Sequence, residues 1–307
     1  MSRTTANLLL LVAGLVWGGG FIAQATAMDD IGPFLFMTMR FLLAALAILP
    51  FAIWEGNKAG AKSLSRNEWL SAIAVGLLFF TAMAMQQLGL LATSVTNAGV
   101  LTGLYVVLVP IIVLGVFKEQ QPKIIWPAAA AAFFGIWLLG GGGLDKLTWG
   151  DWIIIIGALF AALHVIAMGR TVTDLRRPAL LASAQFAISG ILAAVGFAIS
   201  RAMEYSFEPP FSLATTIAAG PEILYAALFA GALAFTIMAV CQQYTSASNA
   251  AILLSSEALF AALAGAIFLD ERLTPMGYLG CGILFAAIVV VSVAAAKLED
   301  EELETRT

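Results

Sequence analysis

Four side chains able to bind a proton or a polar solute lie deep within apolar stretches of the sequence: Trp17, Tyr105, His164 and Glu257. If these stretches are α-helices, a rise of about 1.5 Å per residue puts Glu257 about 12 Å and His164 about 18 Å from the start of its stretch. Both depths are near the middle of an apolar layer about 30 Å thick. A carboxyl group is costly to hold there, so Glu257 either takes part in binding or is a protonated acid bonded to a neighbouring helix.

Other polar residues in these stretches allow the same two kinds of interpretation. Gln86 and Gln242 each have a second glutamine beside them, and one of each pair can face a cavity while the other bonds between helices. Arg40 lies about 10 Å from a helix end, a position from which an arginine can snorkel to the interface. Pro110 cannot donate a hydrogen bond to the carbonyl group of Val106, so it predicts a kink that is either a gate or a static bend.

No pattern in the sequence predicts a metal, a cofactor or a nucleotide. His164 is the only histidine, and Cys241 and Cys281 both lie in apolar runs. The sequences HExxH, CxxC, GxSxG and Walker A are absent. We therefore expect a protein that is not an enzyme, with no metal site and no cofactor.

The composition indicates that most of the chain is surrounded by lipid. Hydrophobic residues make up 61% of its 307 residues and charged residues only 11%, whereas soluble domains carry about 25% charged residues. The net charge of −4 gives no reason to expect a nucleic-acid partner. We expect the lipid bilayer and a small-molecule solute as partners, and the sequence leaves the oligomeric state open.

Ten apolar stretches are long enough to cross a bilayer, which needs about 20 residues in a helix. Prolines stand at the first helical positions of several, where the missing N–H group costs nothing. The sequence therefore predicts an all-α integral membrane protein with ten transmembrane helices, at 7–27, 33–54, 69–92, 95–117, 123–142, 152–170, 178–200, 221–244, 248–269 and 275–296.

The basic residues between these stretches predict the orientation. With the N-terminus in the cytoplasm, the cytoplasmic side carries 11 lysines and arginines and the other side carries 3. Because cytoplasmic loops are enriched in these residues, we expect both termini in the cytoplasm and the chain in a cell inner membrane.

The sequence of residues 93–98, TSVTNA, recurs at 245–250 as TSASNA, 152 residues later. The same interval carries Glu119 onto Glu271, and an interval of 145 residues carries Arg40-Phe41 onto Gln185-Phe186. Each repeat therefore holds five helices, at 1–147 and at 148–307 with a short acidic C-terminal tail. An odd number of helices inverts the second repeat in the membrane, as in many secondary transporters. The alternative is chance similarity between two apolar segments.

The repeat brings the four central side chains into one prediction. Tyr105 is the counterpart of Glu257, and the counterpart of Trp17 lies two positions from His164. A cavity at mid-depth, lined by the first, fourth, sixth and ninth helices, would collect all four. Each of them also has a structural interpretation, as a packed aromatic side chain or as a buried group with satisfied hydrogen bonds.

Several motifs resemble the drug/metabolite transporter superfamily in its EamA-type branch. Trp17-Gly18-x-x-Phe21, Pro33 and Arg40-Phe41 resemble its first helix pair, and residues 101–110, LTGLYVVLVP, resemble its fourth helix. Residues 244–257 and the segment LDERLT at 269–274 resemble its ninth helix. The family often has proline after the ninth-helix glutamate, whereas this chain has Ala258.

The resemblance implies a five-plus-five helix fold and the export of metabolites, with aromatic and neutral amino-acid exporters as the nearest group. We therefore expect a secondary transporter that works by alternating access around a central cavity. The expected substrate contacts are Trp17, Gln86, Tyr105, His164, Gln242 and Glu257, with Pro110 as a gate. The alternatives are a channel for small solutes and a membrane-embedded enzyme that modifies lipid, for which the sequence lacks paired catalytic groups.

Overall fold

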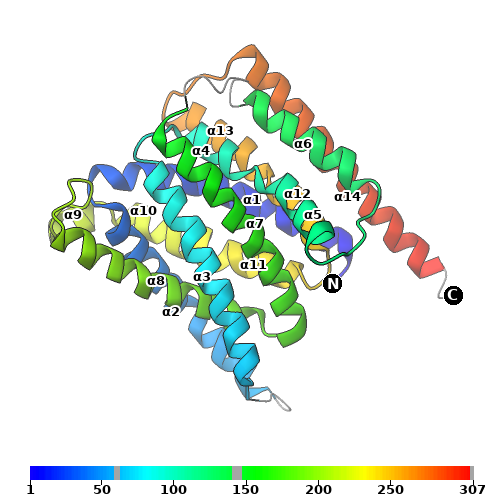
Figure 1. Cartoon of the computed structure of the whole chain (residues 1–307), viewed down its shortest axis with the longest axis horizontal. Helices are drawn as coiled ribbons and strands as arrows, with labels where there is room; N and C mark the ends of the chain where they lie inside the picture. The colour runs from blue at the N-terminus through cyan, green and yellow to red at the C-terminus, as the bar shows by residue number, and fades with distance from the viewer. Residues whose placement is uncertain (59–62, 140–146, 305–307) are drawn as a thin grey trace.

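The computed structural model describes residues 1–58, 63–139 and 147–304, with side chains as far as residue 294, and this part of the chain contains helices and no strands. The helices pack into one bundle (Figure 1). Lys62, Lys146, the expected end of the fifth helix at 142 and residues 305–307 of the acidic tail lie outside the described residues.

The helices of the described chain follow one another in a bundle with short connections. Ala27–Asp29 is a single 3₁₀ turn, and Tyr225–Leu233 is a π-helix between α10 and α11. The α-helices are α1 Arg3–Thr26, α2 Pro33–Asn57, α3 Arg66–Gly89, α4 Val95–Thr102, α5 Tyr105–Gly115, α6 Ile125–Leu139, α7 Trp149–Leu175, α8 Pro178–Ala202, α9 Leu213–Ala218, α10 Gly220–Leu224, α11 Ala234–Cys241, α12 Ala247–Leu254, α13 Ser256–Phe268 and α14 Pro275–Glu304.

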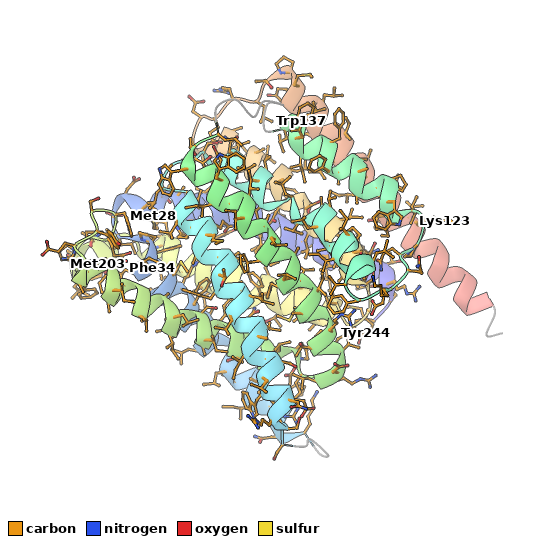
Figure 2. All side chains as sticks on the ribbon, viewed as in Figure 1. Met28, Phe34, Lys123, Trp137, Met203 and Tyr244 are labelled. Atoms are coloured by element: carbon orange, nitrogen blue, oxygen red, sulfur yellow. The ribbon has the colours of Figure 1, made fainter. Side chains whose placement is uncertain are left out.

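Nine helical segments of the described chain are long and apolar enough to cross a membrane. The apolar helix α6 is shorter, with 15 residues, so the structure does not by itself establish ten spans. Large apolar side chains cover the outside of the bundle (Figure 2), and Leu46 and Phe51 are more than 60% exposed. Such a surface is stable in lipid and not in water, because nothing polar covers it.

Two predicted spans are interrupted near their centres. The segment expected at 95–117 is divided between α4 and α5 at Gly103 and Leu104, and the segment expected at 248–269 is divided between α12 and α13 at Ser255. Gly103 and Ser255 are 152 residues apart, the interval of the sequence repeat. Pro110 lies inside α5, after this interruption, and the kink that the sequence predicts there stays a prediction.

The closest helix pairs are α2 with α8, α3 with α7, and α6 with α14, while α1 lies along α13. Figure 1 shows α6 and α14 side by side at the edge of the bundle. Gly18 permits the approach of α1 to α13, because a β-carbon there would lie 2.7 Å from the carbonyl carbon of Phe260. Gly18 therefore serves close packing of these two helices, whereas Gly19 and Gly20 face Tyr225 and Ala230 of the π-helix.

A glutamate at the C-terminal end of each of the helices α2 and α8 caps the N-terminus of the other helix. Glu208, in the loop after α8, accepts hydrogen bonds from the backbone N–H groups of Phe34 (2.8 Å) and Leu35 (3.1 Å). Glu55, near the end of α2, accepts from the N–H groups of Ala179 (3.1 Å) and Leu180 (3.0 Å). These caps satisfy donors that a helix leaves unpaired and place a negative charge at the positive end of each dipole.

Burial raises the pKa of Glu208 above its ordinary value, although both N–H donors and the nearby Arg201 oppose that shift.

The residues labelled in Figure 2 mark the two ends of the bundle. Phe34, Met28 and Met203 lie at one end, and Lys123 and Tyr244 lie near the termini at the other (Figure 2). We call these the distal end and the terminal end.

Candidate functional site

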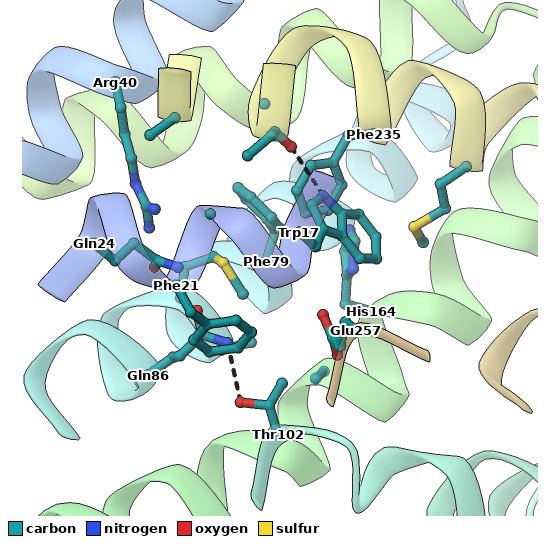
Figure 3. A pocket seen from close by; sticks show the side chains of 18 of the residues that line it. Trp17, Phe21, Gln24, Arg40, Phe79, Gln86, Thr102, His164, Phe235 and Glu257 are labelled. Atoms are coloured by element: carbon teal, nitrogen blue, oxygen red, sulfur yellow. Dashed lines mark hydrogen bonds between the residues drawn. The ribbon is translucent and has the colours of Figure 1, made fainter. Parts of the chain in front are cut away.

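A cavity of about 70 Å³ lies in the middle of the bundle, between helices from both halves of the chain (Figure 3). Its wall comes from α1, α2, α3, α4 and α5 of the first half and from α7, α11, α13 and the π-helix of the second. Most of this wall is apolar and aromatic. A few polar side chains interrupt it, as in sites that bind small amphipathic molecules.

Five of the six side chains predicted to bind a solute line this cavity: Trp17, Gln86, Tyr105, His164 and Glu257. The indole N–H group of Trp17 donates to the carbonyl group of Ala230 at 2.9 Å, and Gln86 Nε2 donates to Thr102 Oγ1 at 3.0 Å; both bonds are drawn in Figure 3. These two bonds fix the positions of the Trp17 and Gln86 side chains in the cavity wall.

Glu257 and Tyr105 lie beside one another just after the two interruptions of the paired helices. The Tyr105 hydroxyl group interacts with the Glu257 carboxyl group, yet neither it nor Glu257 Oε1 has a hydrogen-bond partner of standard geometry among the described atoms. Glu257 is 5% exposed and belongs to the first turn of α13, whose dipole favours a negative charge there. Buried polar atoms without partners are costly, so these two are available to a bound molecule.

His164 has a defined partner outside the cavity. Its Nε2 lies 2.9 Å from Oε1 of Gln185, which is fully buried on α8. The ring is thereby fixed in orientation while its face forms part of the cavity wall.

Gln242 does not line the central cavity. It follows the last residue of α11, and its Nε2 donates to the carbonyl group of Val165 at 2.9 Å. The bond ties α11 to α7 near the terminal end. Pro110 is also absent from the cavity wall, although it is buried within α5.

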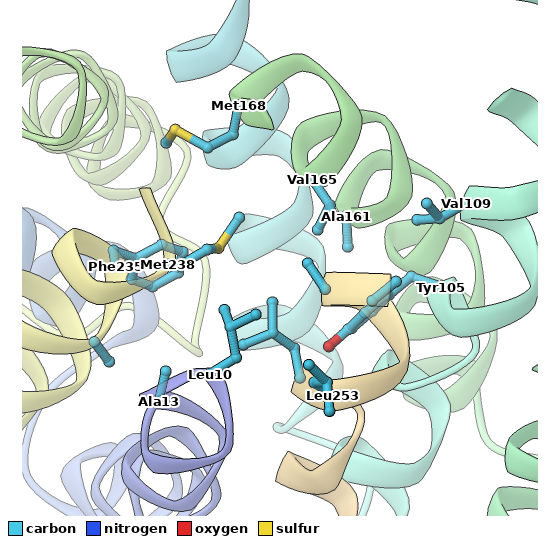
Figure 4. Close-up of a cluster of buried hydrophobic side chains, with 14 of the residues drawn as sticks. Leu10, Ala13, Tyr105, Val109, Ala161, Val165, Met168, Phe235, Met238 and Leu253 are labelled. Atoms are coloured by element: carbon cyan, nitrogen blue, oxygen red, sulfur yellow. The ribbon is translucent and has the colours of Figure 1, made fainter. Parts of the chain in front are cut away.

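An aromatic cluster forms a large part of the wall, and the sequence did not single it out. Phe79 is its centre, with ring centroids 4.8 Å from Phe235, 5.2 Å from Phe41 and 5.2 Å from His164. Trp17 joins it through Phe235 at 4.5 Å. Figure 4 shows the adjoining apolar core, where side chains of α7 and α11 face each other near Tyr105.

Arg40 is the second unexpected member of the site. Its side chain is 5% exposed and lines the cavity, so the expectation that it snorkels to the interface was wrong. Helix rise gives the depth of a residue but not the direction in which it points, and α2 turns Arg40 inward. The cavity therefore contains one basic and one acidic group, Arg40 and Glu257, and the two form no ion pair within the described residues.

Sequence comparison decides the family. The profile of the EamA-like transporter family matches the chain twice, over residues 4–141 and 148–293. The chain belongs to the EamA-like transporter family. It is therefore a multi-pass membrane protein of a transporter family, and the resemblance noted in its motifs is confirmed.

Relatives of this EamA-like transporter support the same conclusion. An uncharacterized transporter of Archaeoglobus fulgidus is 33% identical over 293 residues, which cover 95% of this chain and 87% of the relative. The uncharacterized transporter YwfM of Bacillus subtilis is 26% identical over 98% of each chain. One solved crystal structure has a TM-score of 0.75 at 14% identity, covering 97% of this chain and 100% of that one, which shows a shared fold.

Proposed function

We propose that this EamA-like transporter exports small amphipathic zwitterions, of the aromatic or neutral amino-acid class, by alternating access around the central cavity. The observation that carries the proposal is the composition of the cavity wall. An aromatic cluster surrounds a buried carboxyl group, Glu257, that has an unpartnered oxygen. An aromatic or aliphatic side chain fits the first feature, and an ammonium group fits the second.

The volume of the cavity supports a mechanism in which the surrounding helices move. About 70 Å³ is well below the 300–1,000 Å³ of sites that enclose drug-sized ligands, so a solute needs the surrounding helices to separate. In this mechanism Trp17, Gln86, Tyr105, His164 and Glu257 contact the solute. Gln242 acts by holding α11 to α7, and Pro110 allows α5 to bend as the cavity opens.

The packing supports two inverted repeats, at 1–147 and 148–307, within one membrane unit of ten helices. If α6 counts as the fifth span, the pairs α2–α8 and α6–α14 each join a helix to its own counterpart. Phe41 stacks on Phe186, its counterpart at the 145-residue interval, with ring centroids 5.8 Å apart. Contact between equivalent residues is the mark of a two-fold axis, which here would lie in the membrane plane.

The charge bias of 11 to 3 supports cytoplasmic termini and an inner-membrane location, which make the terminal end the cytoplasmic end. Export then begins with solute entry from the terminal end and finishes with release at the distal end.

Purified protein in proteoliposomes tests this function with a panel of radiolabelled amino acids. We expect saturable uptake of aromatic or neutral members, accelerated when the same amino acid is loaded inside. Glu257→Gln should fold and lose most of this exchange. Flux that neither saturates nor shows counterflow would favour a channel, and the absence of any amino-acid flux would reject the proposal.

A further inference from the structure

Arg40 is a buried charge whose hydrogen-bonding groups are largely unused. Its Nε and Nη2 atoms are inaccessible to solvent and have no hydrogen-bond partner among the described residues. The guanidinium carbon lies 4.4 Å from the ring centroid of Phe41 and 5.0 Å from that of Phe36. Contacts with two rings give about 2 kcal/mol in a desolvated place, which is less than the cost of an unpaired buried charge.

The two free nitrogens are adjacent on the guanidinium group. Together they form the edge that binds a carboxylate through two parallel N–H···O bonds. An arginine side chain is not deprotonated in proteins, so the charge cannot be removed by loss of a proton. The unpaired edge therefore calls for an anion that is absent from the protein itself.

The surroundings indicate which anion fits. Gln24, on the same side of the cavity in Figure 3, also has an unpartnered buried oxygen, while Glu257 lies on the other side with Phe21 and Phe79 between. With one arginine and one glutamate, the wall has no excess of positive charge. A phosphate dianion is disfavoured by that balance, whereas a single carboxylate that also carries a cationic group is favoured.

We propose that the Nε–Nη2 edge of Arg40 binds the carboxylate of the transported solute, while the ammonium group, on the same carbon atom, lies on the side of the cavity that holds Glu257. This inference rests on the proposed function and narrows it, because both charged groups of the solute become requirements. The apolar side chain then lies against the aromatic cluster. Arg40 is thus a specificity-determining residue that selects α-amino acids over amines and over simple carboxylic acids.

Competition in proteoliposomes tests the assignment with three probes: L-phenylalanine, phenethylamine without the carboxylate, and 3-phenylpropionate without the amine. For the wild type, each analogue should compete with labelled L-phenylalanine at least roughly tenfold less well than unlabelled L-phenylalanine. Arg40→Gln should raise the Km for L-phenylalanine by about tenfold or more and reduce its advantage over phenethylamine to about twofold. The Km and the selectivity of Arg40→Lys should lie between those of the wild type and those of Arg40→Gln. Lysine keeps the positive charge but cannot donate two parallel hydrogen bonds to a carboxylate.

Arg170 provides the matched control. It also lies over an aromatic ring, 3.7 Å from the centroid of Phe117, but it is exposed and paired with Glu119. Arg170→Gln should leave the Km and the order of the three probes unchanged. If the wild type carries L-phenylalanine and Arg40→Gln keeps the same Km and selectivity, the Arg40 assignment fails while the proposed function stands.

Thermal unfolding of the purified, solute-free protein gives a second test that needs no transport. Replacing an unpaired buried charge with an apolar side chain relieves its desolvation cost. Arg40→Met should therefore unfold at a temperature higher by about 2 °C or more than the wild type. A lower unfolding temperature would show that Arg40 stabilises the empty protein, and it would overturn the assignment even if no amino acid proved to be a substrate.

Discussion

Gly135 on α6 lies against Gly280 on α14, and the two glycines are 145 residues apart. A β-carbon on Gly135 would come within 2.8 Å of the carbonyl oxygen of Gly280. The same interval separates Phe41 from Phe186, which stack on each other at the α2–α8 contact. Two independent helix pairs thus meet through equivalent residues, and we infer that a pseudo-two-fold axis passes through both.

The α6–α14 contact should tolerate no side chain at Gly135. Gly135→Ala forces the helix backbones apart, so we expect a loss of stability of about 1–3 kcal/mol, measured as a lower unfolding temperature in detergent. Gly282→Ala, on the partner helix α14, is the control, because a β-carbon there meets nothing within 4 Å. Equal effects of the two substitutions would contradict the close crossing.

We infer that Glu271 helps to close the distal end of the bundle in this conformation. Its carboxylate accepts hydrogen bonds from the N–H groups of Val95 and Thr96, each at 3.1 Å, and from the Thr96 hydroxyl group. Its repeat counterpart Glu119 instead pairs with Arg170 at the surface. The two ends of the bundle therefore differ although their sequences correspond.

Glu271→Gln should weaken this closure, because an amide has one acceptor oxygen and no charge for the helix dipole. In a background without Cys241 and Cys281, we expect Ala98→Cys to react several-fold faster with an impermeant maleimide applied at the distal end. Glu119→Gln is the matched control and should leave that rate unchanged. No acceleration by Glu271→Gln would mean that the contact is not a closure.

Pro110→Ala tests whether α5 bends during transport. The substitution restores the hydrogen bond to Val106 and stiffens α5. If bending is part of the cycle, the variant should be at least as heat-stable as the parent and should exchange solute several-fold more slowly at similar Km. A stable variant with normal turnover would leave Gly103 and Leu104, where the helix is already interrupted, as the flexible point.

The stability of the α2 cap should depend on pH through Glu208. Because burial raises the pKa of Glu208, the folded protein binds this proton more tightly than the unfolded chain does. The contribution to stability is complete below the unfolded pKa and decreases as pH rises through the folded pKa. As pH rises through this range, the unfolding temperature should fall less steeply for Glu208→Gln than for the wild type. Parallel curves for the two proteins would show that Glu208 is not the source of the pH dependence.

Much of the fold could be predicted from the sequence, because lipid imposes long apolar helices and proline marks their starts. α2 and α8 begin at Pro33 and Pro178 as predicted. The interruption at Ser255 could not be predicted in the same way, since serine is tolerated inside a helix and its hydroxyl group here bonds to the carbonyl group of Ile252. The π-helix before α11 had no recognisable signal either.

The sequence singled out cavity residues whose type is unusual at their depth in the membrane. It missed those whose place in the cavity depends on the direction in which the side chain points. Glu257 and His164 are rare in an apolar stretch, and both line the cavity. Phe79 is one of 20 phenylalanines, and nothing in the sequence marks it as the centre of a cluster. Arg40 has an apparent route to the interface along the helix, and only the packing of α2 against α8 shows that it points inward.

The central claim is that one cavity opens in turn to each side of the membrane, and accessibility of Met83 tests it most directly. Met83 lines the cavity from α3. In a background without Cys241 and Cys281, Met83→Cys should react with an impermeant maleimide in both right-side-out and inside-out vesicles. A transported amino acid should protect it from both sides. Reaction from only one side, with or without solute, would contradict alternating access through this cavity.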